Sequence, residues 1–315
     1  MILSRATIPG WSIRAAQVAV ALGLMALLWR AADGPDAAQS LAAADPSWLA
    51  LAFLALTAQT VLSALRWQLA AGQLGIRFGP WHAIREYYLA QIVNQSLPGG
   101  MVGDAGRAVR AREQAGLLVS SQAVVFERLA GQVAMFLTLA VAFLGTWLVP
   151  GGLVWPRWLA LPVLGALLLG GALPLVLLAL TRVPGGIGTR SAGLCRAIDR
   201  ALMAPSVLPW HILLSIGTTL CNLAAFSFCL QAVGVWLSLP AIAALVPLIL
   251  FTMLIPVSIS GWGLREGAAA ALLPIAGVPA SSGLAASVAF GLVFIAAVLP
   301  GLVVWLWPAR GTTRR

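Results

Sequence analysis

The chain has 315 residues, of which 61% are hydrophobic and only 9% are charged, against roughly 25% charged residues in an average soluble domain. So few charges cannot cover the surface of a soluble protein of this size, and so apolar a chain is not disordered either. The net charge is +10, and all of the basic residues are arginines. They lie between apolar stretches rather than on one basic domain, so we expect no nucleic-acid partner.

Six stretches are apolar enough to cross a membrane as helices, which takes about 20 mostly apolar residues. Two further stretches are apolar but broken by Pro and Gly. The sequence therefore predicts an all-α polytopic membrane protein, with residues 1–315 forming a single integral membrane domain. The six are residues 15–29, 48–65, 117–149, 158–180, 208–233 and 282–307, and the broken stretches are 80–114 and 240–274.

The arginines indicate how the chain is oriented. They gather before the first span, after the second, after residue 180 and at the C-terminus, whereas residues 30–45 carry three aspartates and one arginine. Because cytoplasmic loops are rich in basic residues, all four groups and both termini are expected in the cytoplasm. This requires that each broken stretch enters and leaves the membrane on one side, the first from the cytoplasm and the second from outside. In this prediction Arg66, Arg77 and Arg85 follow the second span. The predicted location is the inner membrane of a bacterium.

The two broken stretches share a pattern. Pro98, Gly103 and Arg107 have the spacing Pro-x4-Gly-x3-Arg, which recurs 158 residues later. The same offset maps residues 48–65 and 117–149 onto the spans near 208–233 and 282–307. Paired spans would run in opposite directions, so we predict an inverted-topology repeat with halves at 1–150 and 151–315. Such repeats place a substrate site near the membrane midplane.

The broken stretches are expected to form re-entrant helical hairpins. Backbone that leaves the helix inside a membrane must be shielded from lipid or line a wet cavity. A short helix follows each break, and its first-turn amides and positive dipole end suit an anion. The alternative is that Pro and Gly only kink ordinary spanning helices. The break residues expected in the interior are Pro98, Gly99, Gly100, Gly103, Pro256, Gly261 and Gly263.

Two arginines are the leading candidates for binding a phosphate. Arg107 and Arg265 are expected in the first turn after each break, and a guanidinium can hold a phosphate through two hydrogen bonds. Asp104 precedes Arg107 by three residues, and Glu266 directly follows Arg265.

A second charged pair and an amide complete the set of candidates. Glu127 and Arg128 lie about three turns into the helix that begins at residue 117, and Asn94 precedes the first break. Charges at such depth are costly and indicate a functional site by default. The alternative is that these charges pair locally to hold the hairpins in place, and that Asn94 caps exposed backbone instead of donating to a headgroup.

Three segments together resemble the lysylphosphatidylglycerol synthase transmembrane-region family. Residues 94–107 read Asn-Gln-Ser-Leu-Pro-Gly-Gly-Met-Val-Gly-Asp-Ala-Gly-Arg, residues 126–131 read Phe-Glu-Arg-Leu-Ala-Gly, and residues 255–267 read Ile-Pro-Val-Ser-Ile-Ser-Gly-Trp-Gly-Leu-Arg-Glu-Gly. The resemblance covers nearly the whole chain. It departs from the family pattern where Val102 and Trp262 replace glycine.

The resemblance implies lipid translocation. The best-known members resemble the flippase half of multiple peptide resistance factor, which moves aminoacylated phosphatidylglycerol from the inner to the outer leaflet. Other members are associated with hopanoid production or with glycosyltransferase genes. Because the chain shows no soluble aminoacyltransferase domain, we do not expect it to make lysylphosphatidylglycerol itself.

The leading prediction is therefore a flippase for a phospholipid or another lipid-linked anionic substrate. No nucleophile, metal-ligand constellation or nucleotide motif is found, so we expect neither catalytic residues, a metal site nor a cofactor. Two alternatives stay open: an accessory membrane subunit of a lipid- or glycan-modifying pathway, and an intramembrane enzyme with Glu127 or Glu266 as acid or base. Partners that stay open are a second copy of the chain and a lipid-biosynthesis enzyme.

Overall fold

The computed structural model describes residues 10–97, 101–148, 153–255, 258 and 260–306. These residues are almost entirely helical and contain no strand, and five helical segments are long and apolar enough to cross a membrane. This confirms the predicted all-α polytopic class. The five are α3 (Pro46–Gln73), α5 (Val102–Leu148), α6 (Arg157–Leu180), α8 (Leu208–Ala232) and the segment Ala280–Val304, formed by α11 (Ala280–Val298) and the start of α12 (Pro300–Leu306).

The first expected span forms helix α1 (Gly10–Ala31), which is not among these five. The short helix α2 (Gly34–Ala42) follows it and leads to α3. Asp45 begins α3 as its N-cap, and its carboxylate accepts a hydrogen bond of 2.8 Å from the Ser47 amide. The Asp45 amide also donates to the carbonyl of Ala232 at 2.9 Å, which ties the start of α3 to the end of α8.

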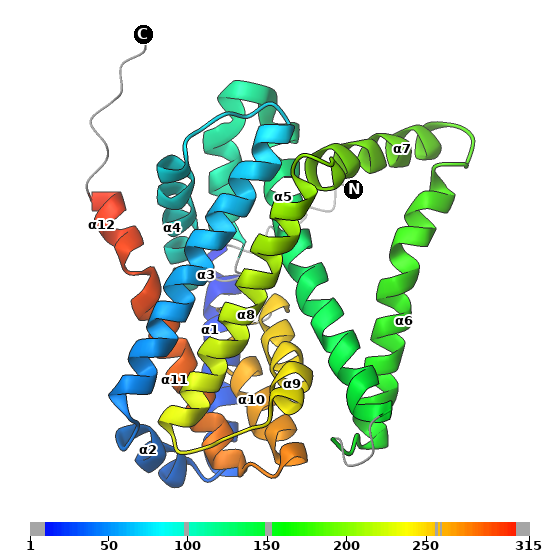
Figure 1. Cartoon of the computed structure of the whole chain (residues 1–315). Helices are drawn as coiled ribbons and strands as arrows, with labels where there is room; N and C mark the ends of the chain where they lie inside the picture. The colour runs from blue at the N-terminus through cyan, green and yellow to red at the C-terminus, as the bar shows by residue number, and fades with distance from the viewer. Residues whose placement is uncertain (1–9, 98–100, 149–152, 256–257, 259, 307–315) are drawn as a thin grey trace, which may run out of the picture.

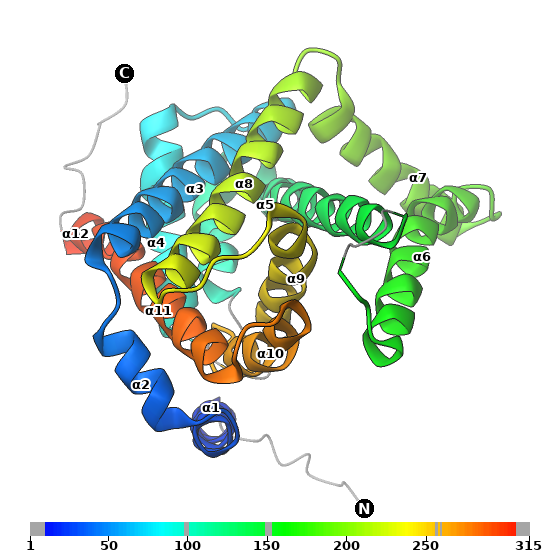
Figure 2. The same cartoon turned by 60° about the horizontal axis from the view of Figure 1, so that its bottom comes forward.

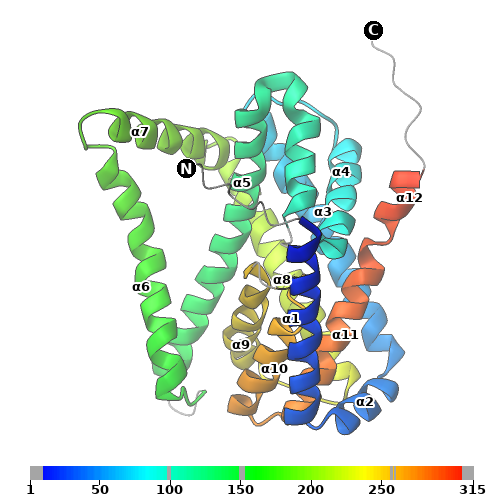
Figure 3. The same cartoon turned by 180° about the vertical axis from the view of Figure 1, so that it is seen from behind.

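Two helical hairpins turn back in the middle of the bundle (Figures 1 and 3). Helix α4 (Pro80–Ser96) descends from the upper end of Figure 1, and the first part of α5 returns to that end. At Gly116 the backbone leaves the helical conformation with a φ of 79°, and α5 then runs down the bundle. A φ in this region favours glycine, because a Cβ would be strained there.

The second hairpin opens toward the opposite end. Helix α9 (Leu239–Phe251) rises from the lower end of Figure 1, continues through η2 (Thr252–Leu254), and is followed by α10 (Leu264–Leu272), which descends again. The 3-10 segment η3 (Leu273–Ala276) then leads to α11. Near the tips of the two hairpins, the Ser260 hydroxyl donates to the side-chain carbonyl of Gln95.

The helices of the two halves follow the same order under the 158-residue offset. Helix α3 maps onto α8, α4 onto α9 with η2, the first part of α5 onto α10, and its second part onto α11 and α12. Helices α3 and α8 pack side by side and run in opposite directions (Figures 1 and 2). This order agrees with the inverted repeat, whose details stay a prediction.

The basic and acidic connections lie at opposite ends of the bundle. Helix α2, flanked by Asp33 and Asp45, lies at the lower end of Figure 1. The α3–α4 connection with Arg77, and helix α7 (Gly186–Ile198) with Arg190, lie at the upper end. The sequence predicts this grouping if each hairpin leaves the membrane on the side from which it enters.

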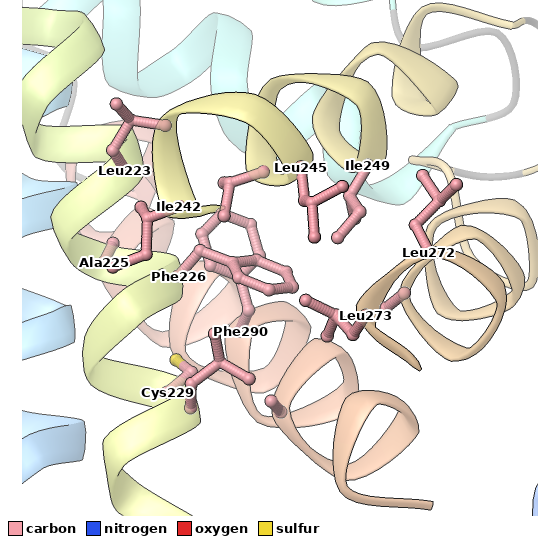
Figure 4. Packing of buried hydrophobic residues seen from close by; sticks show 14 of the residues in the cluster. Leu223, Ala225, Phe226, Cys229, Ile242, Leu245, Ile249, Leu272, Leu273 and Phe290 are labelled. Atoms are coloured by element: carbon pink, nitrogen blue, oxygen red, sulfur yellow. The ribbon is translucent and has the colours of Figure 1, made fainter. Parts of the chain in front are cut away.

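The core of the second half is apolar and aromatic (Figure 4). The rings of Phe226 on α8 and Phe290 on α11 lie 5.5 Å apart between their centroids, and Phe294 continues the contact. Side chains from α9, α10 and η3 surround this pair. Those labelled in Figure 4 include Ile242, Leu245, Ile249, Leu272 and Leu273, all of them buried.

Helix α6 stands apart from the bundle along part of its length (Figures 1 and 3). It contacts α5 where Gly170 faces the ring of Phe136, since a Cβ on Gly170 would lie 2.4 Å from that ring. Helix α7 and the π-helical segment η1 (Asp199–Met203) connect α6 to α8. Most of α6 therefore presents leucine and valine side chains outward, as a lipid-facing helix does.

Candidate functional site

Glu127 on α5 is the centre of a buried charge cluster. Its side chain is 0% exposed, and each carboxylate oxygen binds an arginine. Arg66 Nη2 donates to Oε1 at 2.9 Å, and Arg107 Nη2 donates to Oε2 at 3.3 Å. The Tyr87 hydroxyl also donates to Oε1 at 3.3 Å. Three helices, α3, α4 and α5, therefore converge on one carboxylate.

Asp104 extends the cluster toward the tip of the first hairpin. Its Oδ1 accepts from Arg107 Nη2 at 2.9 Å, and its Oδ2 accepts from Arg128 Nε at 3.0 Å and lies 2.7 Å from Arg128 Nη2. The side-chain amide of Asn94 donates to Oδ2 as well, at 3.2 Å. We call Arg66, Asp104, Arg107, Glu127 and Arg128 the first cluster.

The first cluster holds more positive than negative charge. Three guanidinium groups face two carboxylates, which leaves an excess of one positive charge. Within the described part of the chain, Nε and Nη1 of Arg107 and Nε of Arg66 are buried without a hydrogen-bond partner. The Arg107 guanidinium instead lies 4.5 Å and 4.4 Å from the ring centroids of Trp67 and Tyr87, which stabilise its charge through cation–π contact.

Two sequence predictions about these arginines are wrong. Arg66 was expected in the loop after the second span, but α3 continues to Gln73 and buries Arg66, because residues 66–73 extend the same helix. Arg107 was expected in the first turn after the break, but α5 begins at Val102 and places Arg107 in its second turn. Asp104 occupies the first turn instead.

A second cluster lies at the start of α10. Arg265 donates to its neighbour Glu266, and its Nε donates to the Ser287 hydroxyl of α11 at 3.1 Å. Ser287 in turn donates to Glu266 Oε1 at 3.2 Å, and Glu266 Oε2 accepts from the Gly263 amide at 2.7 Å. One guanidinium here faces one carboxylate, and both are at most 1% exposed. We call Arg265, Glu266 and Ser287 the second cluster.

The second cluster is also tightly enclosed. The Arg265 guanidinium lies 5.2 Å and 5.4 Å from the ring centroids of Trp262 and Phe290. Gly291 on α11 faces this group, and a Cβ there would lie 2.3 Å from Arg265 Nη2 and 2.8 Å from the Trp262 ring. The arginine therefore has no room to move without displacing its neighbours.

Two backbone amides at the starts of α5 and α10 are already used within the protein. The Gly103 amide donates to the Asn94 side-chain carbonyl at 2.7 Å, and the Gly263 amide donates to Glu266. Asn94 thus caps backbone, which was one of the two alternatives for it. Gly103, Gly261 and Gly263 are buried, but Gly103 was expected in the break and is instead the second residue of α5. Pro98, Gly99, Gly100 and Pro256 lie outside the described residues.

Gly103 has a packing role. A Cβ on it would lie 2.0 Å from the carbonyl oxygen of Ala90, so only glycine lets α5 approach the backbone of α4 this closely. This approach allows Asn94 to reach both the Gly103 amide and Asp104.

An apolar groove with a volume of about 1060 Å³ adjoins the first cluster. Its walls are the second part of α5, one face of α8 and the start of α9, and η1 closes one end. Ser215 links groove and cluster, because it lines the groove and accepts a hydrogen bond of 3.3 Å from Arg66 Nη1. Arg66 Nη1 also donates to Thr218 at 2.9 Å.

The sequence analysis did not identify several residues that belong to these clusters or contact them. Trp67, Tyr87 and Ser287 carry no charge, so nothing in the sequence separated them from other core residues. For Arg66 a signal was present: it lies only one residue beyond the apolar stretch 48–65, within a turn of its end. Among the described residues no group of three His, Cys, Asp or Glu side chains could hold a metal ion.

The sequence profile of the family described as lysylphosphatidylglycerol synthase TM region matches residues 14–301. The chain belongs to this family. The match covers both hairpins and both clusters, so the lysylphosphatidylglycerol synthase TM region forms almost the whole chain. A search of curated proteins found no match. Membership indicates a multi-pass membrane protein with a lipid-modifying or flippase-type role.

Proposed function

We propose that this protein moves an anionic phospholipid, or another lipid-linked anionic substrate, from one leaflet of the bacterial inner membrane to the other. The observation that supports this most is the first cluster: all of its members but Arg128 are buried, it carries excess positive charge, and Arg66 contacts the apolar groove through Ser215. A phosphate is stabilised by guanidinium groups, and acyl chains are stabilised by apolar side chains.

The hydrogen bonds of the first cluster favour an anionic over a cationic headgroup. Both oxygens of Asp104 and both of Glu127 already accept from arginines. The charge of both carboxylates is thus already compensated by three arginines, which would repel a lipid ammonium. A phosphate can instead take the unpartnered donors of Arg107 and Arg66. We therefore propose that the carboxylates position the arginines rather than bind substrate.

The arginines of the first cluster would also compensate the charge of a phosphate inside the membrane, where the dielectric constant is low. A buried charge without a partner is costly, and removing one partner from a buried ion pair destabilises a protein by roughly 3–5 kcal/mol. A phosphate that approaches the exposed side of Arg128 adds a partner there while Asp104 stays in place, so each guanidinium and each carboxylate stays paired. Arg128 suits this approach, since its side chain is 41% exposed.

We assign a supporting role to the second cluster. Arg265 and Glu266 satisfy each other, and Ser287 and the Gly263 amide take up their remaining bonds. In this proposal they hold the second hairpin as it enters the membrane from outside, while the first hairpin enters from the cytoplasm. The basic end of the bundle is then cytoplasmic.

The test is a leaflet-resolved translocation assay in proteoliposomes. Fluorescent phosphatidylglycerol and its aminoacylated, cationic counterpart are placed in one leaflet, and their transfer is followed by quenching from outside. We expect faster transfer of the anionic probe, and a loss of at least about tenfold in the Arg107→Gln variant. Equal transfer of both probes, or wild-type transfer by folded Arg107→Gln protein, would overturn the proposed site.

A further inference from the structure

The apolar groove is long enough to hold the acyl chain of a lipid. Its wall on α5 runs from Leu129 to Thr146, a distance of about 25 Å at 1.5 Å per residue. The hydrocarbon core of a bilayer is about 30 Å thick. Both α5 and α8 are among the helices able to cross a membrane, so the groove lies at the depth of the acyl chains.

One end of the groove carries an unsatisfied polar side chain. His211 lines the groove near the start of α8 and is only 4% exposed. Neither of its ring nitrogens makes a hydrogen bond of good geometry within the described residues, although the Ala201 carbonyl lies nearby. A neutral imidazole offers one donor and one acceptor, and leaving both unused in an apolar setting is costly. Ser215 and Thr219 follow His211 at intervals of four residues, so the three side chains form a polar stripe facing the groove.

The other hydroxyls of the groove are satisfied by their own helices. Thr138 donates to the Ala134 carbonyl at 2.9 Å, and Thr146 donates to the Ala142 carbonyl at 2.7 Å. The polar end is therefore at His211. His211 is in the first turn of α8, and α8 begins at the upper end of Figure 1, the end of the basic connections.

We propose that this groove is a binding site for one acyl chain of a membrane phospholipid, whose phosphate–glycerol end is held by His211. The site deepens the proposed function and rests on it: a lipid would load here from the leaflet at the basic end, with its phosphate within reach of Ser215 and Arg66. The phosphate and ester oxygens accept from the imidazole, and a glycerol hydroxyl donates to it.

The occupant is a lipid because of where the groove lies and what lines it. Ile212, Ile216 and Leu220 are each more than half exposed along one face of α8. At this depth in a membrane, the surrounding solvent is acyl chains. An apolar face of a second copy or of a partner helix would leave His211 without hydrogen-bond partners. A phospholipid headgroup provides them.

The test uses phosphatidylglycerol that carries a photoreactive diazirine on one acyl chain, with the full-length protein in phosphatidylglycerol–phosphatidylethanolamine vesicles. Crosslinked peptides are identified by mass spectrometry. We expect adducts on the facing walls of α5 and α8. Ile216→Trp should fill the groove and reduce these adducts several-fold, whereas Leu213→Trp, an exposed position on another face of α8, should not.

The role of His211 is tested with a second pair of variants. His211→Phe keeps the ring but removes both hydrogen-bonding atoms, and His211→Gln keeps a donor and an acceptor. We expect His211→Phe to reduce phosphatidylglycerol adducts about fivefold and His211→Gln to restore most of them. A diacylglycerol probe with the same chain lacks the phosphate and should respond much less to either variant.

Two results would overturn the site: adducts spread evenly over all outward faces, or equal adduct yields in the Ile216→Trp and Leu213→Trp variants. A groove occupied by another protein copy would exclude the probe and leave the facing walls of α5 and α8 without lipid adducts, which would also overturn it. The Arg107→Gln variant separates this site from the proposed function. It should lose translocation yet keep the groove adducts, because Arg107 does not line the groove.

Discussion

The two charge clusters occupy related positions after the two helix breaks, but they are built differently. The second pairs one arginine with one carboxylate and encloses both between aromatic rings and Gly291. The first joins three arginines to two carboxylates, retains unpartnered donors, and includes a partly exposed arginine. Two related backbone segments thus carry different sites. The second cluster is an enclosed, neutral ion pair, and the first cluster is a positively charged network that is partly exposed. The difference is the reason why we propose the first cluster, and not the second, as the anion site.

The largest expected effect comes from removing the carboxylate shared by two arginines. Glu127→Gln leaves Arg66 and Arg107 buried with less compensation, so we expect a loss of roughly 3–5 kcal/mol in the free energy of unfolding. Thermal unfolding in detergent measures it. Glu113→Gln on an exposed part of α5 is the matched control and should change little. Equal stabilities of the two variants would contradict the buried network.

A smaller effect separates the two clusters by their packing. Gly291→Ala forces contact with both the Arg265 guanidinium and the Trp262 ring, and should cost roughly 1–3 kcal/mol. Gly131→Ala meets only the end of the Arg66 side chain, at 2.7 Å, which can shift. It should therefore cost less. Thermal unfolding of both variants tests this, and the reverse order would show that the first cluster is the more rigid one.

Ser287→Ala should have a modest effect within the second cluster. It removes the hydroxyl that bridges Arg265 Nε and Glu266 Oε1, and we expect a loss of roughly 1–3 kcal/mol because both partners stay buried. The folded Ser287→Ala protein should still translocate lipid at the wild-type rate. A loss of translocation without a loss of stability would instead place the second cluster on the substrate path.

The smallest effect is expected at a pair outside both clusters. Arg110 is 46% exposed and pairs with Glu86 near the basic end of the bundle. The Glu86 side chain is only 10% exposed, but Arg110 reaches solvent, which screens the pair. The pair should therefore contribute no more than roughly 1 kcal/mol, and Arg110→Gln should unfold close to the wild-type temperature. A large loss of stability would mean that the Arg110–Glu86 ion pair, and not the buried ion pairs of the first cluster, controls the stability of the first hairpin.

Much of the fold was predictable from the sequence, because long apolar stretches have few alternatives in a membrane. Five of the six expected spans form helices able to cross a membrane, and both broken stretches form hairpins. The spacing around Pro98 and Pro256 indicated the two related sites. Individual pairings were not predictable, since they depend on where each helix ends. Arg66 joined the cluster because α3 runs on to Gln73, and Asn94 turned toward Gly103 because α4 and α5 approach closely.

The central claim is that the open first cluster binds the phosphate of the lipid that is moved. Arg128 tests it most directly, because its partly exposed side chain can be changed with little loss of stability. Leaflet-resolved transfer of phosphatidylglycerol should fall at least about tenfold in Arg128→Gln and stay at the wild-type rate in Arg190→Gln, an exposed arginine on α7. Wild-type transfer by folded Arg128→Gln protein would contradict the claim.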